Sequence, residues 1–128
     1  MKLPRPLLSF TAVAALAIAG PALAHPKLVS SSPAANATVA KPARITLTFS
    51  EKLLPPMSGA QLVVTAMPGM ANHLPMAITG LKTSVAGGGK TLIVQLPRPL
   101  AAGTYQLKWH AVAGDTHRIA GTFSFTVK

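Results

Sequence analysis

Short stretches of alternating apolar and polar residues, separated by prolines and glycines, dominate this chain. Residues 45–49 read Ile-Thr-Leu-Thr-Phe, and this period of two is typical of a strand with one buried face. No segment of useful length carries a helical stripe. The strands predicted from this pattern span residues 28–29, 45–49, 62–65, 92–96, 104–110 and 122–127. Six or seven short strands in about 100 residues predict an all-β fold, an antiparallel β-sandwich or a small barrel.

The N-terminal segment has the pattern of a secretory signal peptide. Lys2 and Arg5 precede a short apolar run, and Ala-Leu-Ala at positions 22–24 is a small-x-small cleavage site. The apolar run is too short for a typical membrane span, which disfavours the alternative of an uncleaved anchor. We therefore expect residues 1–24 to be cleaved and residues 25–128 to form one domain, exported to a bacterial periplasm.

Composition excludes several classes of site. The chain has no cysteine, so neither a disulfide framework nor a cysteine-based zinc or iron–sulfur site is possible. Its two acidic residues are too few for a calcium cage together with a catalytic carboxyl pair. The twelve Lys and Arg residues are spread singly and aromatic residues make up only 5%, which disfavours nucleic-acid binding. This charge suits solubility, or attraction to an acidic partner or an anionic membrane surface.

One segment interrupts the strand pattern with a regular series of possible metal ligands. Sulfur and imidazole side chains occupy every third position, at Met67, Met70, His73 and Met76. Pro68 and Pro75 favour a polyproline-like conformation, in which residues three apart share one side. Thioethers are soft donors that select Cu(I), and an imidazole can join them. The segment therefore predicts a Cu(I) site, with methionine as adaptable core filler as the alternative.

A second set of possible ligands begins at the predicted cleavage site. Cleavage would make His25 the N-terminal residue, so that its α-amine and imidazole can chelate one ion, while Pro26 offers no amide N–H to copper. Asp115 and His117 lie two residues apart, and in an extended segment they would face the same side. Amine, imidazole and carboxylate donors suit tetragonal Cu(II), and Ni(II) or Zn(II) less well. Taken alone, a terminal histidine is often an accident of processing, and an Asp-x-His sequence is often a polar turn.

Several of these residues belong to longer motifs. The chain resembles the CopC/PcoC family of periplasmic copper-binding proteins in residues 25–33 (His-Pro-Lys-Leu-Val-Ser-Ser-Ser-Pro), 49–51 (Phe-Ser-Glu), 65–70 (Thr-Ala-Met-Pro-Gly-Met), 102–105 (Ala-Gly-Thr-Tyr) and 115–117 (Asp-Thr-His). The resemblance implies an immunoglobulin-like antiparallel Greek-key β-sandwich or barrel of about seven strands. It also implies a copper carrier rather than an enzyme, with Cu(II) and Cu(I) sites near opposite ends. The Cu(II) pattern matches His25, Asp115 and His117, and the Cu(I) pattern matches Met67, Met70, His73 and Met76.

The Cu(I) pattern departs from that of typical relatives at two places. Val64 stands where they have a further methionine, and both Ala71 and Asn72 separate Met70 from the histidine, where one residue is usual. Three sulfurs and one nitrogen remain, which is still a donor set for Cu(I). Met57 would supply a further sulfur only if its loop folds near this segment.

Four other residues have less specific interpretations. Trp109 and Tyr105 are predicted core anchors on one face of a strand, and His110 is a structural residue on the opposite face. Glu51 is either a partner that hydrogen-bonds a ligand imidazole or one half of a surface salt bridge.

The function predicted from these patterns is a periplasmic copper-binding carrier in copper homeostasis and resistance. Its expected partners are an inner-membrane copper transporter or a periplasmic multicopper oxidase. Two alternatives stay open. A terminal histidine together with a second histidine resembles the histidine brace of copper oxygenases, although Asp115 would occupy an open coordination position that such an enzyme needs. The chain would otherwise be an interaction module whose metal binding is incidental.

Overall fold

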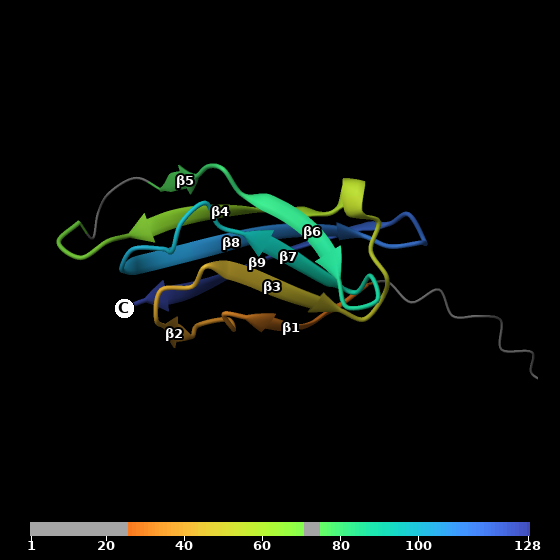
Figure 1. Ribbon diagram of the computed structural model, residues 1–128, viewed down its shortest axis with the longest axis horizontal. Helices are drawn as coiled ribbons and strands as arrows, with labels where there is room; N and C mark the ends of the chain where they lie inside the picture. The colour runs from red at the N-terminus through yellow and green to blue at the C-terminus, as the bar shows by residue number, and fades with distance from the viewer. Residues whose placement is uncertain (1–25, 71–74) are drawn as a thin grey trace, which may run out of the picture.

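The chain folds into two β-sheets that face each other (Figure 1). The computed structural model describes residues 26–70 and 75–128. The strands of this part are β1 (Leu28–Ser32), β2 (Thr38–Val39), β3 (Arg44–Phe49), β4 (Gly59–Ala66), β5 (Met76–Ile78), β6 (Lys82–Ala86), β7 (Thr91–Gln95), β8 (Gly103–Val112) and β9 (Arg118–Val127). A single turn of 3₁₀-helix, η1 (Pro55–Met57), lies between β3 and β4. The described residues include no helix that is long and apolar enough to cross a membrane.

The strand order confirms the predicted all-β sandwich. One sheet has the order β1-β3-β7-β6, and the other has the order β2-β9-β8-β4-β5. Consecutive strands pair only in the hairpins β4–β5, β6–β7 and β8–β9, so the other connections pass between the sheets. All pairs are antiparallel except β2–β9, which is parallel. Strands β2, β5 and β6 were not predicted. β2 has only two residues and β5 only three, and β6 is mostly exposed, so none of them shows an alternation of buried and exposed residues.

Alternation along the strands fills the space between the sheets. In β3, Ile45, Leu47 and Phe49 are buried, and the intervening threonines are only half-buried. Phe49 meets Trp109 of the opposite sheet edge to face, with ring centroids 5.2 Å apart. The Trp109 ring also covers Gly121 on the neighbouring strand, where an added Cβ would lie 2.4 Å from Cζ2. Glycine at this position therefore makes room for the largest aromatic side chain of the core.

Tyr105 is also a core residue, as predicted. Its side chain is buried and stacks on Phe125 with ring centroids 5.7 Å apart, and its hydroxyl donates a hydrogen bond of 2.7 Å to the carbonyl of Ala101. Burial raises the pKa of the Tyr105 phenol, so the hydroxyl stays a hydrogen-bond donor at neutral pH. This bond ties the start of β8 to the loop before it.

The antiparallel register of β4 and β8 separates two loop regions that matter for function. Gly59 pairs with His110, whereas Ala66 pairs with Thr104. The segment that follows Ala66 therefore lies at one end of the sandwich, and the turn between β8 and β9 lies at the other (Figure 1). Asp115 and His117 belong to one end, and Met67, Met70 and Met76 belong to the other.

Candidate metal sites

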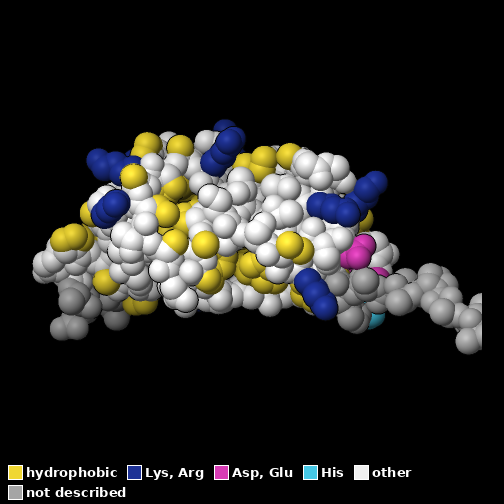
Figure 2. Space-filling model, turned by 90° about the horizontal axis from the view of Figure 1, so that it is seen from below, with side chains coloured by type: hydrophobic (Ala, Val, Ile, Leu, Met, Phe, Trp, Pro, Cys, Tyr) yellow, Lys and Arg dark blue, Asp and Glu magenta, His cyan; other side chains and the backbone are white. Residues whose placement is uncertain are grey.

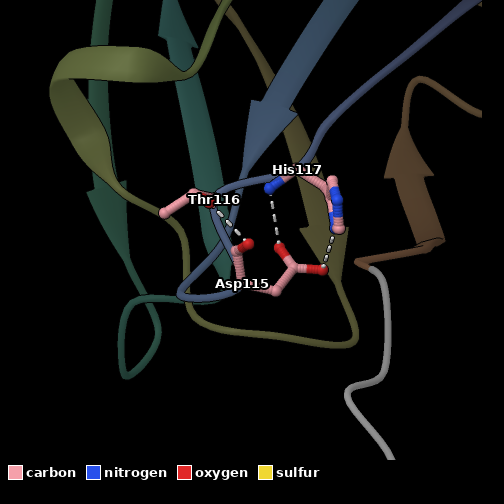
Figure 3. Close-up of polar contacts among 3 residues, drawn as sticks. All are labelled: Asp115, Thr116 and His117. Carbon is pink, nitrogen blue, oxygen red and sulfur yellow. Dashed lines mark hydrogen bonds and ion pairs between the residues drawn. The ribbon is translucent and has the colours of Figure 1, made fainter.

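A tight turn between β8 and β9 brings Asp115 and His117 together. The Thr116 N–H donates to the Ala113 carbonyl at 2.9 Å, and the His117 N–H donates to Asp115 Oδ1 at 3.1 Å. The other carboxylate oxygen, Oδ2, lies 3.4 Å from His117 Nδ1 (Figure 3). The Asp115 side chain is 5% exposed, whereas the His117 side chain is 69% exposed. A shielded carboxylate thus faces an imidazole that is open to solvent.

The backbone of this turn differs from the prediction. We expected an extended segment, in which residues two apart face the same side, but Thr116 has a left-handed φ of 63°. An aspartate side chain that accepts a hydrogen bond from the backbone two residues later stabilises a turn of this kind. Asp115 and His117 therefore lie close together because of a turn, and the expectation that strand alternation would bring them together was wrong.

The start of the described chain is fixed at the same end of the sandwich. The Pro26 side chain is fully buried. The Lys27 N–H donates to Ser50 Oγ, and the Ser50 N–H donates to the Lys27 carbonyl, each at 2.9 Å. Figure 3 shows the beginning of β1 beside the Asp115–His117 turn. The predicted ligand His25 directly precedes Pro26 in the sequence and lies outside the described residues.

Both acidic residues of the chain lie at this end. Glu51 directly follows Ser50, and two residues later Leu53 forms a β-bridge with Ala113, next to the turn that holds Asp115. Figure 2 shows acidic side chains gathered at one end, while Lys and Arg side chains are scattered. Within residues 26–70 and 75–128, no ion pair of Glu51 is found, so the salt-bridge interpretation has no support there. The negative charge of this basic protein is therefore concentrated beside one predicted metal site.

At the opposite end, Met67 and Met70 flank a β-turn. The Met70 N–H donates to the Met67 carbonyl at 2.9 Å, and Gly69 has a φ of 77°. Proline at the second position and glycine with positive φ at the third are the signature of a type II turn. A polyproline-like conformation is therefore wrong for residues 67–70. The turn instead places the two methionines opposite each other as bridge partners.

Met76 approaches the same region from β5. It pairs with Val64 of β4, and both residues line a cavity of about 560 Å³ that Met67 and Tyr105 also line. Met67 packs partly against the core, whereas Met70 and Met76 are 55% and 61% exposed. The filler interpretation therefore fits Met67 better than the other two. The fourth predicted donor, His73, lies outside the described residues.

The structure also locates Met57, whose position was open. Met57 belongs to η1, and the preceding Leu54 donates its N–H to the carbonyl of Val112 at 2.8 Å. Val112 ends β8, so Met57 lies at the same end as Asp115, away from the other methionines. It therefore cannot complete the Met67–Met76 set. Within the described ranges, no three His, Asp or Glu side chains form a group that could hold a metal ion.

Comparison with known proteins gives consistent matches over nearly the whole described chain. A family model described as the CopC domain matches residues 28–128. Copper resistance protein C of Xanthomonas campestris pv. juglandis is 51% identical over 116 residues, which cover 91% of this chain and 90% of the relative. The protein of the same name from Pseudomonas syringae pv. tomato is 51% identical over 117 residues, 90% of each chain. The crystal structure of PcoC, a methionine-rich copper resistance protein from Escherichia coli, has a TM-score of 0.74 at 44% identity and covers 82% of this chain and 100% of PcoC.

Proposed function

The chain belongs to the CopC family, and on this basis we propose that it is a periplasmic copper-binding carrier in copper homeostasis and resistance. The observation that carries the proposal is that Asp115 and His117 lie at one end of the sandwich, whereas Met67, Met70 and Met76 lie at the other. The relatives are named as copper resistance proteins, and a carrier without catalytic activity agrees with those names. Copper is the cargo of this protein rather than a cofactor.

The proposed Cu(II) site consists of His25, through its amine and imidazole, with Asp115 and His117. Two donors that each lie about 2 Å from one ion are separated by at most about 4 Å, so the 3.4 Å between Asp115 Oδ2 and His117 Nδ1 fits a shared ion. The shielded carboxylate and the nearby Glu51 attract a cation locally, although the whole chain has a net charge of +10. Nitrogen and oxygen donors of this kind suit Cu(II).

The proposed Cu(I) site consists of Met67, Met70, His73 and Met76. The type II turn supports it because it places two thioethers on facing positions, and the shared cavity adds Met76 beside Met67. Met70 and Met76 expose apolar side chains that a core residue would bury. A role in metal binding explains this exposure better than core packing does. Separate ends allow one molecule to hold both oxidation states without competition for ligands.

The proposal extends to processing and partners. Residues 1–24 act as a signal peptide, and the exported domain 25–128 passes copper to an inner-membrane transporter or a periplasmic multicopper oxidase. Transfer by ligand exchange needs donors that a partner can reach, and the exposed Met70, Met76 and His117 side chains meet this need.

The proposal is tested by native mass spectrometry of the protein after export from a bacterium. The full chain, expressed with its own N-terminal segment, should be recovered from the periplasm with His25 as its first residue. It should bind one Cu(II) ion, and one Cu(I) ion under reducing conditions. A protein that retains residues 1–24, or that takes up neither ion at micromolar concentration, would contradict the proposal.

Val64 offers a gain-of-function test of the Cu(I) site. Val64 lines the cavity beside Met67 and Met76, so Val64→Met should add a fourth thioether to the proposed Cu(I) set and raise the Cu(I) affinity about tenfold, or 1.4 kcal/mol. Competition with a chromophoric Cu(I) chelator measures this change. Val63→Met is the matched control, because neighbouring strand residues face opposite sides of the sheet and its sulfur would point away from the cavity. Equal affinities of the two variants would place the Cu(I) ion elsewhere.

A further inference from the structure

A hollow lined by polar side chains lies on the outer face of the five-stranded sheet, and one of its lining residues, Arg118, directly follows the proposed Cu(II) ligand His117. Three neighbouring strands place Gln61, Lys108 and Thr122 in one row across β4, β8 and β9. The hollow has a volume of about 400 Å³, and His110, Arg118 and Ala120 also line it. All of these polar side chains belong to strands that the sheet hydrogen bonds hold in register. The position of the hollow is therefore set by the sheet rather than by a loop.

Small residues beside His110 explain why this face is hollowed. Gly59 and Ala120 flank His110 in the next row of the sheet. The imidazole lies against Gly59, where an added Cβ would be 3.1 Å from Cε1. Because the ring lies toward β4 and Ala120 has only a methyl group, space remains between Lys108 and Arg118. Glycine at 59 and alanine at 120 thus shape a recess that larger residues would fill.

The hollow has an excess of positive charge and hydrogen-bond donors. Lys108 and Arg118 are exposed, and neither has an ion-pair partner among residues 26–70 and 75–128. The residues that line the hollow include no carboxylate. Burial lowers the pKa of His110, and the positive charge of Arg118 lowers it further, so the ring is neutral at neutral pH. A bound anion would supply the missing negative charge.

We propose that this hollow binds a phosphate group through Lys108 and Arg118, with the Gln61 amide and the Thr122 hydroxyl as further donors. Phosphate oxygens accept several charge-assisted hydrogen bonds at once, which matches two cations beside two neutral donors. The same group occurs as free inorganic phosphate and as the headgroup of an anionic phospholipid, and an outward-facing sheet surface is accessible to either. The site uses none of the proposed copper ligands, although Arg118 directly follows His117 in the sequence.

Titration with inorganic phosphate tests the site directly. The ¹⁵N-labelled, copper-free protein, expressed as the full chain and purified as the cell processes it, is titrated at constant ionic strength. Amide signals of β8 and β9 around Lys108 and Thr122 should shift and saturate. Lys108→Gln should weaken binding about tenfold, the loss expected for one charge-assisted hydrogen bond. Lys108→Arg keeps the charge and should retain binding, and the spectrum of each variant reports that it is folded.

Lys82→Gln is the matched control for a general charge effect. Lys82 is exposed on β6 of the other sheet, so this variant has the same net charge as Lys108→Gln but an intact hollow, and it should bind phosphate like the unmodified protein. Equal weakening in both variants, or no saturable shift in the unmodified protein, would overturn the proposal.

Lipid vesicles then distinguish the two sources of the phosphate group. If the ligand is a headgroup, the protein should sediment with phosphatidylglycerol vesicles more than with phosphatidylcholine vesicles, and Lys108→Gln should lose this preference while Lys82→Gln keeps it. If the ligand is free phosphate, the titration saturates and neither vesicle type retains the protein. Both results support a phosphate site, whereas retention of Lys108→Gln and Lys82→Gln on phosphatidylglycerol vesicles to the same extent contradicts it.

Discussion

One extra residue ahead of His25 should weaken Cu(II) binding by at least about 100-fold. The extension converts the terminal amine into an amide, so the amine and imidazole of His25 can no longer chelate one ion. Changing a residue that only hydrogen-bonds a metal ligand lowers the metal affinity about 10- to 100-fold, and loss of the ligand itself should lower it more. Isothermal titration or competition with a Cu(II) chelator measures the affinity of the processed protein with and without an added alanine.

A matched extension shows whether the effect is specific to the N-terminus. An alanine added after Lys128 changes the composition in the same way, but it follows β9 and leaves the amine of His25 unchanged. The Cu(II) affinity of this variant should equal that of the unmodified protein. Asp115→Ala and His117→Ala should each lower the affinity as well, since both side chains belong to the proposed donor set. If the N-terminal extension binds Cu(II) as tightly as the processed protein, the amine is not a ligand.

Replacement of Met67 and Met70 together by leucine should reduce the Cu(I) affinity by at least about 100-fold and leave the Cu(II) affinity within about twofold. Leucine keeps the volume and apolar character of methionine but has no sulfur donor, so the type II turn should persist. The two effects should separate because the turn that holds Met67 and Met70 lies at the opposite end from Asp115 and His117. Chelator competition in each oxidation state measures both affinities.

Met57→Leu is the control for this experiment. Met57 is 53% exposed, much like Met70, but it lies in η1 at the far end of the sandwich. The same chemical change at this position should leave the Cu(I) affinity of the methionine site unchanged. An equal loss in Met57→Leu would show that sulfur content, rather than the Met67–Met76 arrangement, determines Cu(I) binding. A large change of Cu(II) affinity in the double variant would show that the two ends are coupled.

Most of the fold could be predicted from local patterns. The alternation in residues 45–49 matches β3 (Arg44–Phe49), and the strand predicted at 104–110 lies within β8 (Gly103–Val112). Burial of Tyr105 and Trp109 followed from the same alternation. The short strands β2 and β5 escaped prediction because two or three residues cannot show a period, and β2 pairs with β9, which is distant in the sequence.

The candidate site was predicted less completely than the fold. Residue chemistry indicated which side chains suit copper, and the resemblance to CopC/PcoC proteins grouped them into two sets. The local conformations expected for those sets were wrong. Thr116 adopts a left-handed backbone, and residues 67–70 form a type II turn, because hydrogen bonds within each turn outweigh the extended conformations assumed from spacing alone.

The sequence by itself determined the strand-rich class of the fold, the absence of thiols, and the presence of thioether, imidazole and carboxylate side chains, which are the donor types that Cu(I) and Cu(II) prefer. These are properties of residue type and of neighbours along the chain. Only the tertiary structure decided that Glu51 lies at the same end as Asp115, that Met57 lies far from Met67, and that Lys108 and Arg118 border one hollow. Such proximities depend on the register of strands that are distant in sequence, and burial of the whole core selects that register.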